Sequence, residues 1–252
     1  MTPSLLLIGA QKAGTSAVFD MLSRHPQVIR PRVKEIMFFN RDEEYEKGLR
    51  HYLTKFPARP LRGGPAITFE ASVGYLYHDG TPRRIKAMLP GVRLAAILRE
   101  PVSRAYSAWN MFRQFRDHRL YADLYDPRPF EQAIMEEIDG HPVHRAHRYL
   151  DRGHYAPQLR RYFDVFGREG LQLFSYGQLQ EDPRSVVDAI LRTVDLDAAP
   201  LGDKVFKVRK NKRPYVSTLS PALEDRLRAH CASWQGELED LLGHGFPLER
   251  AG

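Results

Sequence analysis

A segment near the start of the chain has the residue types and the spacing of a phosphate-binding loop. An apolar run at residues 4–8 ends at Gly9, and Gly14 follows just before a stretch with helical spacing of apolar residues. A glycine-bounded turn between a buried strand and a helix points backbone N–H groups and the helix dipole at one place, which binds phosphate. A lysine within the loop would add positive charge there. The candidate phosphate ligands are Lys12, Ala13, Gly14, Thr15 and Ser16.

Two other interpretations of this loop are compatible with its residues. One is an ordinary turn with an incidental lysine, in which Thr15 and Ser16 only cap the helix. The other is a kinase that uses ATP and magnesium. The nucleotide-triphosphatase pattern, however, places lysine directly after the second glycine and then Ser or Thr. Here Thr15 occupies that position and the lysine stands at Lys12, so the kinase interpretation lacks its key residue.

The elements that position these residues follow from the periodicity of the apolar residues. Strands are predicted at residues 4–8, 67–70, 93–98 and 171–175. Helices are predicted at residues 15–24, 101–116, 130–138, 156–166 and 183–194, and a last helix is predicted from Ser220 to about residue 243. Alternating strands and helices predict an α/β fold whose parallel sheet binds ligands at the carboxyl ends of its strands. Because no linker or repeat divides the chain, we expect one domain over residues 1–252.

The composition is that of an ordinary globular protein. Of the 252 residues, 42% are hydrophobic and 27% are charged. No window approaches the roughly 20 apolar residues that span a bilayer. Cys231 is the only cysteine, so an intramolecular disulfide and a cysteine-based metal site are excluded. The first apolar run has no basic segment before it and no cleavage site after it, which are the marks of a signal peptide. We therefore expect a cytoplasmic protein.

The charge balance points to an anionic partner. The formal net charge is +7 and the isoelectric point is about 9.5, which suits nucleic acid, a membrane surface or a small molecule carrying phosphate or sulfate. A nucleic-acid-binding protein is the strongest interpretation from another class, because basic residues cluster at 113–119 and 204–213. That interpretation leaves the glycine loop and the glutamates unexplained. We therefore expect no nucleic-acid partner.

Taken in order along the chain, the motifs resemble those of the sulfotransferases that use 3′-phosphoadenosine 5′-phosphosulfate (PAPS). Within that family, the chain is most similar to the heparan sulfate N- and 3-O-sulfotransferase type and to bacterial enzymes that share its motifs. The resemblance implies a P-loop-like fold with three layers, α/β/α, around a mostly parallel sheet. It also implies transfer of a sulfuryl group from PAPS to a hydroxyl or amine, which leaves 3′-phosphoadenosine 5′-phosphate (PAP). The segments that carry it are residues 8–16, 25–26, 34–39, 70–75, 99–107, 152–159 and 241–247.

The resemblance also implies residues that bind the 3′-phosphate. In the family, an arginine at a strand end and a serine eight positions later hold this group, and Arg99 and Ser107 have that spacing. Arginine suits the role because its side chain can donate two parallel hydrogen bonds to phosphate oxygens. Arg104 could join them or face the solvent. A basic loop late in the family's sequences folds over the 3′-phosphate and the adenine, which implies that Lys210 and Arg213 bind the cofactor.

Sulfuryl transfer needs an aligned acceptor, a base for its proton and positive charge near the bridging oxygen. The resemblance assigns the base to Glu35, and the apolar residues that follow it could shield its carboxylate from water. The alternative for Glu35 is an ion pair with Lys34 on a surface loop. Glu70 is the second candidate, as a base or as a ligand of the acceptor hydroxyl. Lys12 would stabilise charge on the bridging oxygen, and no metal is required.

Other candidates are weaker. Histidine is the base in another branch of the family, so His78 and His154 are possible bases, although a lone histidine is more often structural or exposed. Trp109 and Phe112 follow Ser107 on the same predicted helix, and we expect them in the core rather than stacked on the adenine.

Two departures from the family's pattern concern the acceptor. Family members often carry a lysine after the glutamate that matches Glu70, whereas this chain has Ala71, so one contact is missing or supplied elsewhere. The family's disulfide near the basic loop is also absent, which fits a reducing compartment. We expect a small-molecule or glycan acceptor, anionic ones included, and two loops at residues 114–128 and 138–148 to select it. The sequence leaves the acceptor and the oligomeric state open.

Overall fold

The structure is a computed structural model that describes residues 1–58, 66–207, 214–243 and 245–248. The chain divides into two compact units. The first consists of Met1–Leu98 and Gln158–Lys210, and the second consists of Arg99–Pro157 and Asn211–Arg250. A single domain over residues 1–252 stays a prediction.

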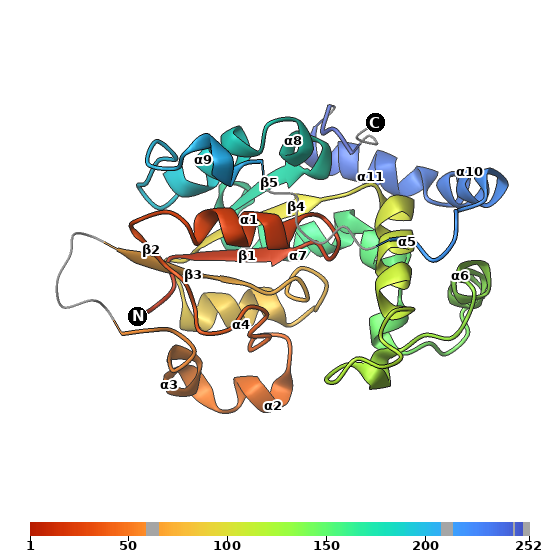
Figure 1. Cartoon of the computed structure of the whole chain (residues 1–252), viewed down its shortest axis with the longest axis horizontal. Coiled ribbons are helices and arrows are strands. Elements are labelled where there is room, and N and C mark those ends of the chain that lie inside the picture. The colour runs from red at the N-terminus through yellow and green to blue at the C-terminus, as the bar shows by residue number, and fades with distance from the viewer. Residues whose placement is uncertain (59–65, 208–213, 244, 249–252) are drawn as a thin grey trace. The chain divides into compact units, whose positions relative to one another are not determined.

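A five-stranded parallel sheet forms the centre of the first unit, with the strands β1 (Leu5–Gly9), β2 (Val28–Ile29), β3 (Ile67–Ala71), β4 (Arg93–Leu98) and β5 (Leu171–Ser175). Their order across the sheet is β2-β3-β1-β4-β5 (Figure 1). Leu7 of β1 is paired with Ala71 of β3 on one side and with Ala95 of β4 on the other. All residues of β1 are buried, as expected for a strand covered on both faces. The carboxyl ends of β3, β1 and β4 therefore lie side by side.

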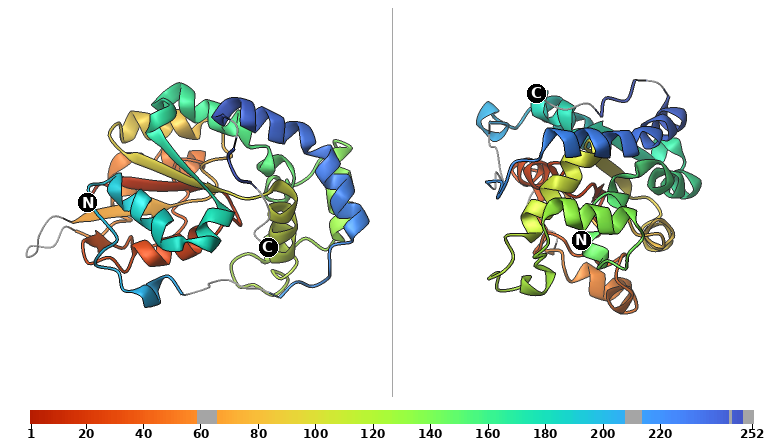
Figure 2. Two further views of the ribbon diagram at one scale, coloured as in Figure 1. Left: turned by 90° about the horizontal axis from the view of Figure 1, so that it is seen from above. Right: turned by 90° about the vertical axis from the view of Figure 1, so that its right-hand side faces the viewer.

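Helices cover both faces of this sheet and include α1 (Thr15–Leu22), α4 (Thr81–Met88), α7 (Tyr155–Phe166), α8 (Tyr176–Glu181) and α9 (Pro183–Arg192). Seen from above in Figure 2, the red-orange α1 and the cyan α9 lie on one side of the sheet, and the gold α4 and green α7 lie on the other. Two short helices, α2 (Asp42–Tyr45) and α3 (Gly48–Leu53), follow the segment that carries Glu35. The predicted three-layer α/β/α fold around a parallel sheet is confirmed.

The second unit is mainly helical and includes α5 (Pro101–Phe112), α6 (Phe130–Ile138), α10 (Pro221–His230) and α11 (Ala232–Leu242). Trp109 and Phe112 of α5 are buried in its core together with Phe130 of α6 and Leu227 of α10. The prediction that Trp109 and Phe112 belong to the core is confirmed.

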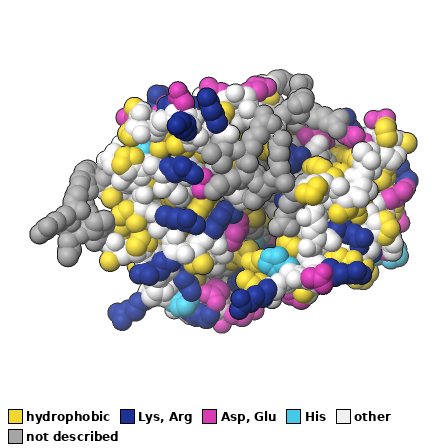
Figure 3. All heavy atoms as spheres, in the orientation of Figure 1, with side chains coloured by type: hydrophobic (Ala, Val, Ile, Leu, Met, Phe, Trp, Pro, Cys, Tyr) yellow, Lys and Arg dark blue, Asp and Glu magenta, His cyan; other side chains and the backbone are white. Residues whose placement is uncertain are grey.

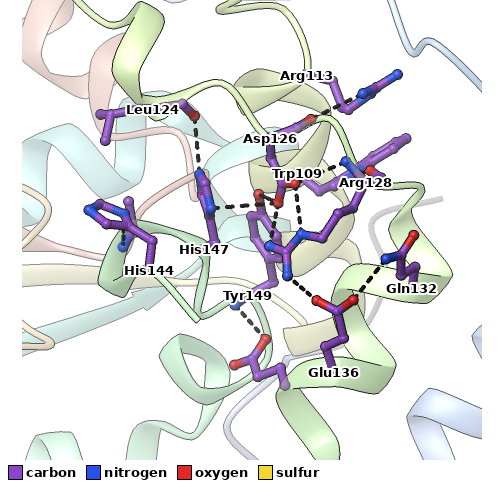
Figure 4. A network of polar contacts seen from close by, with 12 residues as sticks. Trp109, Arg113, Leu124, Asp126, Arg128, Gln132, Glu136, His144, His147 and Tyr149 are labelled. Carbon is purple, nitrogen blue, oxygen red and sulfur yellow. Dashed lines mark hydrogen bonds and ion pairs between the residues drawn. The ribbon is translucent and has the colours of Figure 1, made fainter. Parts of the chain in front are cut away.

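A buried polar network joins the loops on either side of α6 (Figure 4). The carboxylate of Asp126 accepts hydrogen bonds from Nη2 of Arg128 at 2.7 Å and from the hydroxyl of Tyr149 at 2.9 Å. Arg128 also pairs with Glu136 of α6 at 2.5 Å. Burial would raise the pKa of Asp126, but the hydrogen bonds, those from Arg128 above all, outweigh it and lower that pKa. Nε2 of His147 lies 3.1 Å from the carbonyl oxygen of Leu124, and this contact joins the two loops expected to select the acceptor, residues 114–128 and 138–148.

Some predicted elements differ from the structure at their ends. The strands at 93–98 and 171–175 and the helix at 130–138 agree, whereas α5 ends at Phe112 rather than at residue 116. The prediction of a single last helix is wrong, because the backbone of Cys231 leaves the helical region, with ψ of 2°, and separates α10 from α11. The two-residue strand β2 was too short to show a pattern in the sequence.

The surface matches the scattered distribution of charge along the sequence. On the face shown in Figure 3, Lys and Arg side chains lie in separate groups with Asp and Glu side chains among them. Within the part of the chain that the structure describes, no helix is long and apolar enough to cross a membrane.

Candidate active site

The loop between β1 and α1 contains two residues in the left-handed backbone region. Lys12 has a φ of 69° and Gly14 has a φ of 85°. A Cβ atom at Gly14 would lie 2.6 Å from Cδ2 of Leu179, so a larger residue would force a shift. Gly14 is also the N-cap of α1 and supplies no side-chain cap, although its carbonyl oxygen accepts a hydrogen bond from the N–H of Ala17 at 2.9 Å. These features fit a bound phosphate, because anions bind at helix N-termini.

The predicted ligands of this loop differ in their access to solvent. Lys12 and Ser16 are half-buried, whereas Ala13 and Thr15 are buried. The loop is tied to the neighbouring strand at its start, where the N–H of Ala10 donates to the carbonyl oxygen of Ile97 at 2.7 Å.

Glu35 is attached to the carboxyl end of β3. Its backbone N–H donates to the carbonyl oxygen of Ala71 at 3.1 Å, and its Oε2 accepts a hydrogen bond from the N–H of Val73 at 3.0 Å. Its Oε1 lies 2.6 Å from Nζ of Lys34, and each of these two side chains is 24% exposed. Glu35 also has a φ of 62°, which is uncommon for a residue other than glycine. The ion pair between Lys34 and Glu35 that the alternative interpretation expects is therefore present. It is half-buried, however, and the backbone of Glu35 is strained.

The end of β3 is hydrogen-bonded to β1, whose own end leads into the phosphate loop. The N–H of Ser72 donates to the carbonyl oxygen of Leu7 at 3.2 Å, and the N–H of Leu76 donates to that of Ile8 at 2.9 Å. Glu35 and the loop that contains Lys12 are therefore attached to neighbouring strand ends at one edge of the sheet.

Glu70, the second candidate base, lies on β3 with no exposed surface. Its Oε1 accepts hydrogen bonds from the hydroxyls of Ser72 at 2.6 Å and Tyr75 at 2.5 Å, and its Oε2 accepts one from Tyr52 at 2.5 Å. Burial raises the pKa of Glu70 to about 7, the three hydrogen bonds oppose this rise, and the charge of Glu35 adds to it. The carboxylate is therefore satisfied by the protein itself.

Arg99 and Ser107 belong to the second unit. Arg99 directly follows β4, Ser107 lies on α5, and both are half-buried. The carbonyl oxygen of Arg99 accepts a hydrogen bond from the hydroxyl of Tyr155 at 2.8 Å. Glu100 caps α5 by accepting hydrogen bonds from two N–H groups of its first turn, at 2.9 and 2.7 Å.

The remaining candidates have the following positions. Arg104 is buried, donates to the carbonyl oxygen of Tyr149 and has a pKa lowered by burial, so its expected solvent-facing alternative is wrong. His154 lies 2.8 Å from a carboxylate oxygen of Glu237, and His78 is half-buried. Lys210 and Arg213 lie outside the described residues.

The identity of the chain follows from a comparison with protein families. The sequence profile of the sulfotransferase domain matches residues 2–213, which include the phosphate loop, both glutamates, Arg99 and Ser107. The chain belongs to the sulfotransferase family. This agrees with the predicted resemblance.

Two relatives of this sulfotransferase domain are much longer proteins. It is 31% identical over 199 residues to the mouse bifunctional heparan sulfate N-deacetylase/N-sulfotransferase 4, over 75% of this chain and 22% of that protein. It is 28% identical over 210 residues to the type 1 enzyme of Caenorhabditis briggsae, over 79% of this chain and 23% of that protein. The chain thus spans less than a quarter of the length of these relatives.

Solved structures of sulfotransferases resemble the chain over most of its length. The sulfotransferase from Alicyclobacillus acidocaldarius has 28% identity and a TM-score of 0.73, with 97% of each chain covered. A mouse sulfotransferase complexed with PAP has 13% identity and a TM-score of 0.53, over 94% of this chain and 88% of that one. The second likeness concerns the fold alone.

Sequence reasoning missed the hydroxyl groups around Glu70. Ser72 and Tyr75 lie two and five positions after Glu70, inside a segment that had already been noted for its resemblance to the family. Polar residues at this spacing beside a buried glutamate are a usable signal, because a buried carboxylate needs hydrogen-bond donors. Tyr52 lies on α3 and has no such signal in the sequence.

Proposed function

We propose that this sulfotransferase moves a sulfuryl group from PAPS to a hydroxyl or amine acceptor, with Glu35 as the general base. The supporting observation is that Glu35 and the loop of Lys12 are attached to neighbouring strand ends of one sheet. A phosphate-binding loop beside a carboxylate supplies two parts that the reaction requires, namely a cradle for the leaving phosphate and an acceptor for the proton.

Each residue has one role in this proposal. PAPS, when bound, would supply the activated sulfuryl group. Lys12 and the first-turn N–H groups of α1 would bind the 5′-phosphosulfate and offset the charge that develops on the bridging oxygen. Glu35 would take the proton of the acceptor on a carboxylate oxygen. Its contact with the N–H of Val73 would keep that carboxylate oriented while the proton moves.

Binding of the 3′-phosphate is assigned by spacing in the sequence. Arg99 and Ser107 would hold this group, and Lys210 and Arg213 would contact the cofactor from the late basic loop. Arginine at the end of a strand is suited to a phosphate because it stays charged at every accessible pH and donates in pairs. The proposed site uses side chains and backbone N–H groups, so it would work without a metal ion.

The acceptor is proposed to be a carbohydrate or a small secondary metabolite. Support comes from the relatives, whose names specify N-sulfation of heparan sulfate, a glycan. A cytoplasmic location is part of the same proposal, because a chain with one cysteine suits a reducing compartment. Nucleic acid is not proposed as a partner.

The test is an acceptor screen with PAPS labelled in its sulfuryl group. The panel would contain neutral oligosaccharides, oligosaccharides with free amino sugars, sulfated glycans and small phenols. We expect label to appear in at least one hydroxyl or amine acceptor. Transfer of label from γ-labelled ATP, with none from PAPS, would instead support a kinase.

A further inference from the structure

The buried carboxylate of Glu70 is linked through two hydroxyl groups to the segment that carries Glu35. The hydroxyls of Ser72 and Tyr75, which donate to Glu70, also accept hydrogen bonds from this segment. The N–H of Met37 donates to Oγ of Ser72 at 3.0 Å. The N–H groups of the next two residues, Phe38 and Phe39, donate to the hydroxyl of Tyr75 at 3.0 and 3.4 Å.

The direction of these hydrogen bonds is set by Glu70. A hydroxyl has one proton to donate, and its oxygen can accept in return. The ionised carboxylate, which is the form that Glu70 takes as the pH rises above its pKa of about 7, can only accept, so it draws the protons of Ser72 and Tyr75 toward itself. The two hydroxyl oxygens are then directed at the N–H groups of residues 37–39. Glu70 thus orients a chain of hydrogen bonds that runs through Ser72 and Tyr75 to the backbone of residues 37–39.

The backbone of the segment from Glu35 to Phe39 includes two residues in an unfavourable conformation. Glu35 and Met37 have φ values of 62° and 57°, in the left-handed region that side chains disfavour. Residues persist in such conformations only where the surrounding structure fixes them, and they cluster at functional sites. At one end of the segment, Glu35 is hydrogen-bonded to the backbone of Ala71 and Val73. At the other end, residues 37–39 are held by the hydroxyls that donate to Glu70.

We propose that Glu70 is a positioning residue, which acts through Ser72 and Tyr75 to hold Glu35 in its working orientation. The inference rests on the proposed function in one respect, that Glu35 is the base. Glu70 is not a second base, since it has no exposed surface and both of its oxygens already accept hydrogen bonds from hydroxyls. It would touch neither the acceptor nor PAPS.

The test compares three hydroxyl-deleting variants by amide hydrogen exchange at residues 37–39, which requires no substrate. Ser72→Ala should speed exchange at Met37, and Tyr75→Phe should speed it at Phe38 and Phe39, each on the order of tenfold as the local structure opens more often. Tyr52→Phe is the matched control. It removes a hydrogen bond to the same carboxylate, but the hydroxyl of Tyr52 does not hold the loop backbone in the described structure, and its ring would still pack on Phe38. It should leave exchange at these amides within a few-fold of wild type.

Activity measurements complete the test. Ser72→Ala and Tyr75→Phe should lower kcat by roughly tenfold or more while PAP affinity stays within a few-fold. Tyr75→Phe should have no further effect on kcat in a Glu35→Gln background, because a residue that acts only through Glu35 loses its influence when the base is absent. Glu70→Gln should reproduce the exchange pattern of both hydroxyl variants if it folds, and the hydroxyl variants decide the matter if it does not.

The outcomes separate this inference from the proposed function. Unchanged exchange at residues 37–39 in Ser72→Ala and Tyr75→Phe, or an equal increase in Tyr52→Phe, would overturn the positioning role. An additional loss of kcat in the double variant would also overturn it, because Tyr75 would then act independently of Glu35. Faster exchange without any loss of kcat would overturn the positioning role, because the loop could then open more often without disturbing catalysis. Near-normal turnover in Glu35→Gln would instead overturn Glu35 as the base and leave the exchange result standing.

Discussion

The carboxylate of Glu35 accepts a hydrogen bond from the backbone N–H of Val73, 38 residues further along the chain, at 3.0 Å. Glu35→Gln would keep the size of the side chain and an oxygen for this contact, but the amide cannot take a proton. We expect turnover to fall by roughly 10²–10⁴, as is typical when a general base is lost, while PAP affinity stays within a few-fold. Initial rates and calorimetry with PAP would measure the two effects.

The control for this variant is Glu46→Gln, which changes an exposed glutamate in the same region. It should keep wild-type turnover. Near-normal turnover in Glu35→Gln would mean that Glu35 is only the partner of Lys34. Loss of PAP binding in Glu35→Gln would instead make the residue a structural part of the cofactor site.

Arg99→Ala should remove the preference of the protein for a 3′-phosphorylated nucleotide. Ligand binding stabilises the folded state in proportion to the logarithm of saturation, so PAP should raise the Tm of the wild type more than ADP does. The variant should show similar shifts with both ligands and a nearly unchanged Tm without ligand. The matched control is Arg93→Ala, at the exposed start of β4, the strand that Arg99 directly follows. This variant should behave as wild type. Equal shifts with PAP and ADP in the wild type would refute the cofactor assignment.

Lys12→Ala should weaken PAPS binding and slow turnover together. The reason is that the proposed contact of Lys12 with the phosphosulfate exists in both the ground state and the transition state. Steady-state kinetics over a range of PAPS concentrations would show a higher KM and a lower kcat. Lys86→Ala, which removes an exposed lysine from α4, should change neither. An unchanged KM for PAPS in Lys12→Ala would remove Lys12 from the cofactor site.

Sulfuryl transfer should continue in the presence of EDTA. The proposed site offsets the negative charge of the ligand with Lys12, Arg99 and the N–H groups of α1 rather than with a divalent ion. Rates with and without EDTA, with magnesium added back, would measure this. A loss of activity on chelation that magnesium restores would show that a metal ion takes part.

The stability of the protein should depend on pH through Glu70. Burial raises the pKa of Glu70 to about 7, above the ordinary value of 4.5, so the folded state holds this proton more tightly than the unfolded chain does. The resulting stabilisation is fully present below pH 4.5 and is lost as the pH rises through about 7. The shift corresponds to a difference of about 3 kcal/mol in the free energy of unfolding.

Glu70→Gln should remove this dependence. Urea denaturation at about pH 5 and about pH 8 would give the free energies of unfolding, and the wild type should lose stability relative to the variant over that range. Tyr52 and Tyr75, which face the carboxylate, have pKa values raised well above their ordinary range by burial, so they do not titrate in this window. Parallel pH profiles for the two proteins would contradict the buried titration of Glu70.

Local features of the fold could be predicted from local patterns. The apolar strand at 93–98 and the amphipathic helix at 130–138 appear where periodicity places them, because each buries a face set by its own residues. The end of α5 and the break at Cys231 were missed, because helix ends depend on tertiary contacts that no short pattern contains. The short strand β2 is paired with β3, a partner that the pattern of its own two residues does not reveal.

The sequence by itself determined the family and the position of the glycine-bounded turn that is predicted to bind phosphate, because glycines, a lysine and hydroxyl residues at fixed spacing within one turn need only local geometry. The tertiary structure alone decided the different environments of the two glutamates. Glu35 is half-buried beside Lys34 and Val73, whereas Glu70 is fully buried among the hydroxyls of Ser72, Tyr75 and Tyr52. Val73 lies 38 residues from Glu35 and Tyr52 lies 18 residues from Glu70 in the chain. Because burial depends on how whole elements pack, the hydroxyl residues that follow Glu70 could suggest its environment but not decide it.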